Sequence, residues 1–375
     1  MDKSCFKSSE EKARYYSRIK YALAIGETGF FLAFCFLWQA TGLSARLALV
    51  IERLTAGAGL LAAGPAYLAC FFLVYYILAF PSVFYRSFLL EHQFNLSRQR
   101  VPGFFFDQIK SGLLAYVLSA ALLDAFYIAY AAYPDAWWLL AAAGWIVFNL
   151  ALTYLVPLVI VPLFFTYKRL PEGALRARLN ALAQAMGIRL LDIYHIDFSR
   201  RTAAANAGLI GLGSTRRVVL SDTMQQSYTD EEIAAIAAHE FAHSRSGHMF
   251  KLMLVSAGLA AFFFYGVFRA SPVLVSWMHV RSLSDPAAIA GILFLVSLGG
   301  FVSRPLVNAV SRRFESEADR GAIEATGSAS AFISAMEKLA AQNLADPDPP
   351  AVLVRLFYSH PPISERIARA RARQA

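Results

Sequence analysis

Long apolar runs alternate with polar segments along this chain of 375 residues. A helix needs about 20 mainly apolar residues to cross a bilayer, and six runs come near this length or exceed it. The expected spans are residues 21–43, a stretch within 57–85, 111–133, 137–165, 252–268 and 286–303. Glu27 and Asp124 interrupt the first and third runs. Each faces either a polar path between helices, or a span end or neighbouring helix that satisfies it, and neither receives a catalytic role.

The segment between the fourth and fifth runs is patterned like a soluble domain. Leu175, Leu179, Leu182 and Met186 mark one face of a helix that Gly187 ends. Residues 190–196 read as a strand, and 206–210 with 216–221 as a hairpin. The expected domains are a tail at 1–20, four spans at 21–167, a metallopeptidase domain at 168–250, two spans at 251–310 and a polar part at 311–375.

Composition supports a multi-span membrane protein. The chain is 57% hydrophobic and 16% charged, with a mean hydropathy of +0.47, against roughly 45–50% and 25% in soluble domains. The net charge of +9 suits anionic lipid headgroups, and no nucleic-acid motif accompanies it. Cys5, Cys35 and Cys70 are widely spaced and predict neither a metal site nor a disulfide.

Basic residues predict the orientation. They gather in the N-terminal tail, which includes Lys3, and in the loop after the second span, which includes Arg98. The loop around Pro134 has no basic residue, and the loop at Ala45 has only Arg46 and Arg53. By the positive-inside rule, both termini and the 168–250 domain face the cytoplasm.

The run T-D-E-E-I-A-A-I-A-A-H-E-F-A-H from residue 229 contains the candidate chemistry. Thr229 and Glu232 form a capping box, so a helix begins here, and nothing breaks it before Gly247. His239 and His243 are one turn apart on one face. Two such nitrogens suit Zn²⁺, with Glu240 as the base toward water. The alternative is an exposed face that happens to carry two histidines.

A third ligand is expected from another helix, because a catalytic zinc has three protein ligands. The sequence E-S-E-A-D places Glu315 and Asp319 one turn apart on one face. Glu317 is on the far side, near arginines that could pair with it at the surface, and its replacement is expected to be harmless. His248 is counted as opposite to His239 and is not taken as a ligand. Without the histidine motif, the acidic cluster would read as a solvated helix face.

Four motifs together resemble the type I CAAX prenyl proteases, and bacterial members most closely. They are H-E-F-A-H, R-R-F-E-S-E-A-D, N-A-G-L-I-G-L-G-S-T-R-R-V-V-L-S-D-T and Y-S-H-P-P-I-S-E-R, and the loop E-H-Q-F-N-L-S is similar too. The resemblance implies a mainly α fold, in which a multi-pass helical barrel in the membrane encloses a chamber. An inserted α+β zinc-metallopeptidase domain would lie on the cytoplasmic side, and the expected location is a bacterial inner membrane.

The resemblance also implies roles. One Zn²⁺ per chain would be held by His239, His243 and Glu315, with Glu240 as catalytic base. Asp319 would orient a ligand histidine. Asn206 would lie on an edge strand that pairs with substrate. His360 and Arg366 would face the scissile carbonyl.

Three functions follow as hypotheses. The first is a membrane-embedded zinc metalloendopeptidase that cleaves peptides or membrane proteins near the cytoplasmic face. The second is a quality-control protease without prenyl specificity. The third is a transporter or scaffold with structural zinc, although Glu240 would have no purpose there. Some family members have seven spans, whereas six are expected here.

Overall fold

The computed structural model describes residues 8–55, 58–211 and 213–374. The expected start of the second span at residue 57, and Lys3 and Cys5 in the expected tail, lie outside these ranges.

Among the described residues, six helical segments are long and apolar enough to cross a membrane, which confirms the number predicted from the apolar runs. Most are longer than the runs. They are α1 (Ser9–Ala40), α3 (Leu60–Phe84) with its continuation to Gln93, α5 (Val101–Ala132), α6 (Trp137–Leu155) with its continuation to Phe164, α11 (His248–Met278) and α12 (Ile289–Thr326). Two of the continuations pass through π-helical turns, Tyr85–Leu89 and Val156–Ile160, and end in α4 (Leu90–Gln93) and α7 (Val161–Phe164).

Helix α1 shows why the segments exceed the apolar runs. It begins at Ser9 because the side chain of Ser8 accepts a hydrogen bond from the Glu11 N–H, at 3.1 Å. Residues 9–20 therefore extend the first span as helix, where a tail was expected. Polar residues can extend a helix past its apolar run because capping, and not polarity, decides where a helix ends.

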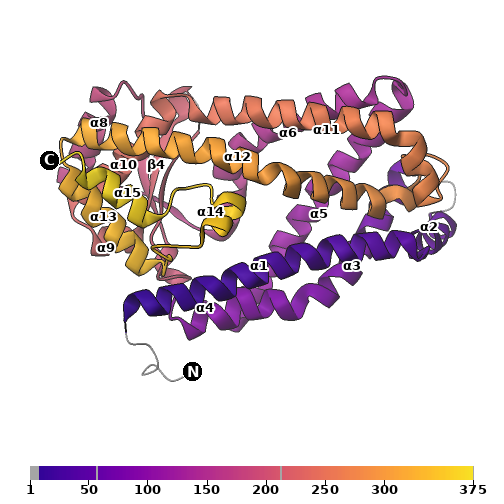
Figure 1. The fold of residues 1–375 in the computed structure, drawn as a ribbon, viewed down its shortest axis with the longest axis horizontal. Helices are drawn as coiled ribbons and strands as arrows, with labels where there is room; N and C mark the ends of the chain where they lie inside the picture. Colours follow the sequence, from indigo (N-terminus) through magenta and orange to yellow (C-terminus); the bar gives the residue numbers. More distant parts are fainter. Residues whose placement is uncertain (1–7, 56–57, 212, 375) are drawn as a thin grey trace.

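The spans form a closed ring. Each of α1, α3, α5, α6, α11 and α12 packs against the next one named, and α12 returns to pack against α1. Figure 1 shows the ring from the side, with α1 and α3 along one wall and α11 and α12 along the other. This ring confirms the expected helical barrel.

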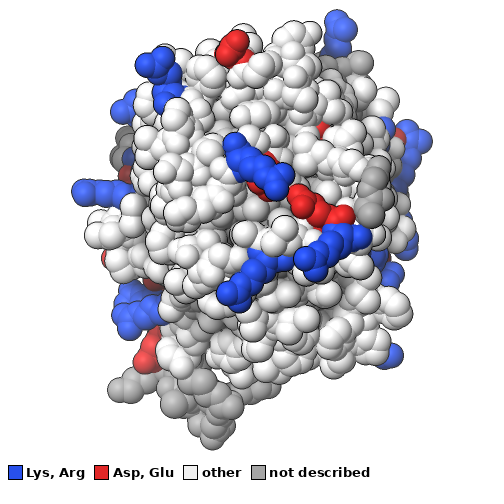
Figure 2. Space-filling model, turned by 90° about the vertical axis from the view of Figure 1, so that its right-hand side faces the viewer, with Lys and Arg blue, Asp and Glu red and all other residues white. Residues whose placement is uncertain are grey.

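Helix α2 (Leu43–Leu54) was not predicted. Its 12 residues span about 18 Å, too little to cross roughly 30 Å of hydrocarbon. It lies across the end of the barrel far from the catalytic motifs (Figure 1), where the Ser44 hydroxyl donates to the Ala287 carbonyl at 2.6 Å. Figure 2 views this end, which is mainly uncharged apart from a small mixed group of basic and acidic side chains.

At the opposite end of the barrel lies a four-stranded sheet in the order β1-β2-β4-β3. Strands β2 and β4 are parallel and the other pairs antiparallel, so the hairpin of β3 and β4 is confirmed. The strands are β1 (Tyr167–Arg169), β2 (Asp192–Ile196), β3 (Ala207–Ile210) and β4 (Arg217–Ser221). The accompanying helices are α8 (Ala174–Ala185), α9 (Asp222–Ser227), α10 (Asp230–Arg245), α13 (Ala329–Gln342), α14 (Ala351–Phe357) and α15 (Ile363–Arg371).

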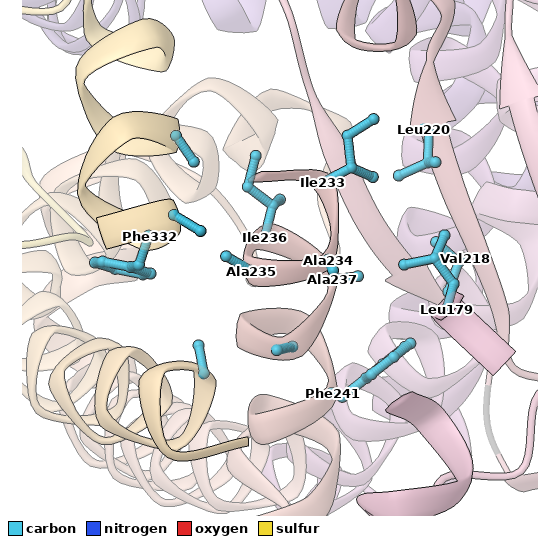
Figure 3. Close-up of a cluster of buried hydrophobic side chains, with 14 of the residues drawn as sticks. Leu179, Val218, Leu220, Ile233, Ala234, Ala235, Ile236, Ala237, Phe241 and Phe332 are labelled. Carbon is cyan, nitrogen blue, oxygen red and sulfur yellow. The ribbon is translucent and has the colours of Figure 1, made fainter. Parts of the chain in front are cut away.

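Helix α10 is the centre of this part of the molecule. Its capping box is present, since Thr229 Oγ accepts from the Glu232 N–H and Glu232 Oε2 accepts from the Thr229 N–H. Figure 3 shows Ile233 and Phe241 directed toward the sheet and α8, while Ala235 faces Phe332 of α13. A helix buried on several faces is apolar nearly all round, and residues 233–238 are all buried hydrophobics.

Small residues let α12 approach α10 closely. Ala318 and Ala322 of α12 are fully buried. A methyl group added at Gly321 would stand 2.9 Å from the Cβ of Ala242, closer than side-chain carbons pack. The glycine is therefore needed for this approach, which brings the acidic motif of α12 against the histidines of α10.

Candidate active site

Helix α10 presents His239 and His243 side by side. Their Nε2 atoms are 3.1 Å apart, and His239 is buried while His243 is half-buried. The two rings share a face because residues i and i+4 do so in any α-helix. The pairing predicted from the sequence is therefore present in the structure.

Glu315 of α12 completes a group of three candidate ligands. Its Oε1 is 3.2 Å from His243 Nε2, and its Oε2 is 3.3 Å from His239 Nε2. One ligand atom from each residue lies within 4.8 Å of the other two. Glu315 is buried, and its Oε2 accepts no hydrogen bond within the described part of the chain. A buried carboxylate oxygen in this position needs a cation.

The chemistry of the donors fits a divalent metal. Asp319 Oδ1 is 2.9 Å from His239 Nδ1, and an ionised carboxylate can only accept, so Nδ1 carries the proton. The lone pair of Nε2 is then directed at Glu315 and His243. In a tetrahedral zinc site with Zn–N of about 2.0–2.1 Å, two nitrogens are about 3.3 Å apart, close to the 3.1 Å found here.

A proton competes for the same position. Burial lowers the pKa of His239, but the neighbouring carboxylates of Asp319 and Glu315 outweigh burial and raise this pKa to about 9. Loading of a metal must therefore displace a proton from the ring.

Arg366 of α15 lies behind His239, where it holds Asp319. Its Nε donates to Asp319 Oδ2 at 2.9 Å and its Nη2 donates to Oδ1 at 2.5 Å. The guanidinium is buried, and Asp319 raises its pKa above the ordinary value against the effect of burial. Asp319 thus engages Nε and Nη2 of the guanidinium behind His239. The expected position of Arg366 at the scissile carbonyl stays a prediction.

His360 lies on the open side of the site, in the loop between α14 and α15. Its Nε2 is 3.2 Å from Glu315 Oε1, while its Nδ1 is 2.8 Å from the Ser359 hydroxyl. The side chain is 56% exposed, so substrate can reach it.

Glu240 and the edge strand share a small cavity. Glu240 and His243 line a space of about 100 Å³ together with Leu209 of β3 and Gly211 just beyond it. Asn206 immediately precedes β3 and is exposed. Its backbone N–H donates to the Ser221 hydroxyl and its carbonyl accepts from the Ser221 N–H.

The sequence reasoning missed the contact of His248 with His243. The Nδ1 atoms of these residues are 3.0 Å apart, and His248 Nε2 is 3.1 Å from Glu317 Oε2. The expectation that His248 faces away, and that Glu317 pairs with surface arginines, is therefore wrong. Helix α10 ends at Arg245 and Gly247 adopts a left-handed conformation (φ 64°), so the helical count does not reach residue 248. Gly247 was the feature of the sequence that could have indicated the end of the helix before His248.

The two acidic residues within the predicted spans, Glu27 and Asp124, differ in their hydrogen bonding. Glu27 Oε1 accepts hydrogen bonds from Ser82 at 2.9 Å and Arg86 at 3.1 Å, so a neighbouring helix satisfies it. Asp124 Oδ1 is buried and makes no hydrogen bond among the described residues.

Both halves of the chain match models of known protein families. Residues 169–374 match the model of peptidase family M48, and residues 3–166 match that of the CAAX prenyl protease N-terminal region, five membrane helices. In the described part of this second region, four candidate spans and the short α2 are present.

The chain matches about two thirds of the length of the individual relatives named next. The chain is 32% identical to the uncharacterized metalloprotease YhfN of Bacillus subtilis, over 74% of this chain and 66% of that protein. It is 30% identical to a CAAX prenyl protease 1 homolog of Arabidopsis thaliana, over 76% and 68%. The crystal structure of S. mikatae Ste24p has the same fold, with a TM-score of 0.83, 24% identity, and coverage of 96% of this chain and 88% of that one.

Fold and site together define a multi-pass membrane protein of the metallopeptidase class. The chain belongs to peptidase family M48, and its membrane part is that of the CAAX prenyl proteases within it. The family implies a metal and peptide substrates.

Proposed function

We propose that the protein is a zinc-dependent endopeptidase, with one zinc held by His239, His243 and Glu315. The convergence of these three donors beside Glu240 is the observation on which the proposal rests. When bound, zinc would supply a Lewis acid that polarises the scissile carbonyl and acidifies water.

The protein's own groups would move the protons. Glu240 Oε takes a proton from the attacking water and delivers it to the amide nitrogen that leaves. His360 faces the open side, from which its imidazole can donate to the oxygen of the carbonyl as negative charge develops there. Arg366 acts indirectly, by holding Asp319 so that His239 keeps its proton on Nδ1.

The substrate would bind as an additional strand along β3. This strand is at the edge of the sheet, and its free side is next to the cavity shared with Glu240. An extended peptide added there bonds through its main chain. Asn206, which is exposed and immediately precedes β3, would hold the peptide at one end of the strand.

The site would face the cytoplasm of a bacterium, from the inner membrane. The basic loop after the second span contacts the peptidase domain, since the Arg98 N–H donates to the Arg201 carbonyl at 2.8 Å. The basic segments and the site are thus at one end of the barrel, and basic segments are retained inside. Substrates would be peptides or membrane-protein segments that reach this surface, with or without a prenyl group.

Metal removal tests the proposal. A chelator should abolish cleavage of an internally quenched peptide by the purified protein in detergent, and Zn²⁺ should restore it. Farnesylated and unmodified versions of the peptide then distinguish prenyl-directed cleavage from general proteolysis. A protein that binds zinc but cleaves neither peptide would support the scaffold or transporter alternative.

A further inference from the structure

The two histidines of the site are held from behind in different ways. His239 Nδ1 meets the carboxylate of Asp319 directly, at 2.9 Å. His243 Nδ1 meets a second imidazole, that of His248, at 3.0 Å, and His248 Nε2 in turn meets Glu317 Oε2 at 3.1 Å. These contacts behind His243 form a row of three residues. The row begins at His243 on α10, passes through His248, the first residue of α11, and ends at Glu317 on α12.

Donor and acceptor roles along this row follow from the ligand. If His243 offers the Nε2 lone pair to a metal, its proton is on Nδ1, which then donates. His248 must accept at Nδ1, so its own proton is on Nε2 and is donated to Glu317. Each hydrogen is shared once and each acceptor is used, and the opposite assignment would leave His243 without a lone pair for the metal.

Packing fixes the intermediate ring. His248 is 1% exposed and stacks on Phe314, with ring centroids 4.4 Å apart and planes 6° from parallel. Gly247 permits the reversal that returns His248 to His243, since its left-handed conformation strains other residues. A buried imidazole with both nitrogens engaged has few orientations, and it therefore constrains the ring of His243 as well.

We infer that His248 and Glu317 are positioning residues, which fix the tautomer and orientation of His243 for the metal. This rests on the proposed metal site. Carboxylates behind ligand histidines raise their basicity, and removal of such a partner typically costs about 10–100-fold in metal affinity. Glu317 is 47% exposed and acts through a second ring, so its contribution should be the smaller of the two.

Zinc affinity of the full-length protein in detergent, measured by chelator competition, tests the inference. His248→Phe retains the stacking on Phe314 but has no acceptor, and should bind Zn²⁺ about 10–100-fold more weakly. His248→Asn places an amide oxygen near the former Nδ1, and should recover part of the loss. Glu317→Ala should lose less than His248→Phe. Glu324→Ala, an exposed acid on the same helix, is the matched control and should bind as the wild type does.

The combined variant separates a relay from two independent effects. Because Glu317 acts only through His248, the pair His248→Phe with Glu317→Ala should bind zinc no more weakly than His248→Phe alone. Melting of the metal-free protein gives the structural readout, and it should not differ between His248→Phe and His248→Asn by as much as their zinc affinities do.

Two results would overturn the inference. One is wild-type zinc affinity in His248→Phe. The other is equal zinc affinity in the Phe and Asn variants with a matching fall in metal-free melting temperature, which would show a packing role. Failure of the metal site itself is distinguishable, because Glu315→Ala would then bind zinc as tightly as the wild type.

Discussion

Replacement of Gly321 by alanine should weaken the metal site without unfolding the protein. The added methyl would stand 2.9 Å from the Cβ of Ala242. Ordinary carbon contacts are at roughly 3.5–4.0 Å, so α10 and α12 must separate by about 0.6–1.1 Å. Both methyls are fixed to their backbones, and no side-chain rotation can relieve the contact.

The expected effect on stability is small because two terms oppose each other. Alanine in a helix interior is favoured over glycine by about 0.8–1.0 kcal/mol, whereas overpacking costs about 1–3 kcal/mol. The net destabilisation is therefore about 0–2 kcal/mol. The metal site has less tolerance, since ligand distances hold to about 0.2 Å. Glu315 is on one helix and the histidines are on the other, so zinc affinity should fall more than about tenfold.

Chelator competition and thermal melting, in the same detergent, measure the two effects. The variant Ala242→Gly combined with Gly321→Ala is the control, because it moves the methyl from α10 to α12 and restores the spacing. It should recover most of the zinc affinity, although glycine in α10 costs about 1 kcal/mol of stability. Wild-type zinc affinity in Gly321→Ala, or no recovery in the combined variant, would refute the argument that this close approach positions the ligands.

Three further predictions concern substrate, topology and the sheet. Asn206→Ala should lower turnover of a peptide while zinc content and melting temperature are unchanged, whereas a fall in melting temperature would indicate a turn residue instead. Cysteines placed singly at positions Pro134 and Gln374 should react with impermeant reagents from opposite sides of the membrane, and labelling from one side would contradict the six spans. Asp192→Ala should destabilise the protein by about 1–3 kcal/mol because the buried Arg176 loses its buried carboxylate partner and retains the exposed Glu172 as its acidic partner. Burial opposes ionisation of Asp192, but the Ile193 N–H and Arg176 outweigh it and hold this pKa below its ordinary value. Its contribution is therefore present above about pH 4 and is lost as pH falls through the folded pKa, so the melting difference from wild type should narrow in acid.

Local patterns predicted those parts of the molecule that are determined locally. Apolar runs indicated the six spans, because the bilayer imposes a minimum length on each. The capping box predicted the start of the helix, and the four-residue spacing of His239 and His243 predicted their shared face, because both features depend only on residues within a turn of one another. Helix α2 was missed because its residues, which include Arg46 and Arg53, were interpreted as the loop between the first two spans.

Tertiary contacts account for what the sequence could not predict. The place of Arg366 behind His239 depends on how α15 packs across α12, which no spacing within either helix contains. His248 was assigned to the wrong side because a helical count was carried through Gly247, where the chain reverses. Glu317 was interpreted from its neighbours on α12, whereas its partner is on α11.

The central claim is that Glu240 performs proton transfer beside a metal held by His239, His243 and Glu315. Glu240→Gln is the most direct test, with Glu231→Gln, an exposed acid on the same helix, as its control. An amide of the same shape cannot accept a proton, so Glu240→Gln should retain about one zinc per chain while peptide cleavage falls at least about 10²–10⁴-fold. The control should bind zinc and cleave as the wild type does. A zinc-loaded Glu240→Gln protein with near-normal turnover would contradict the account.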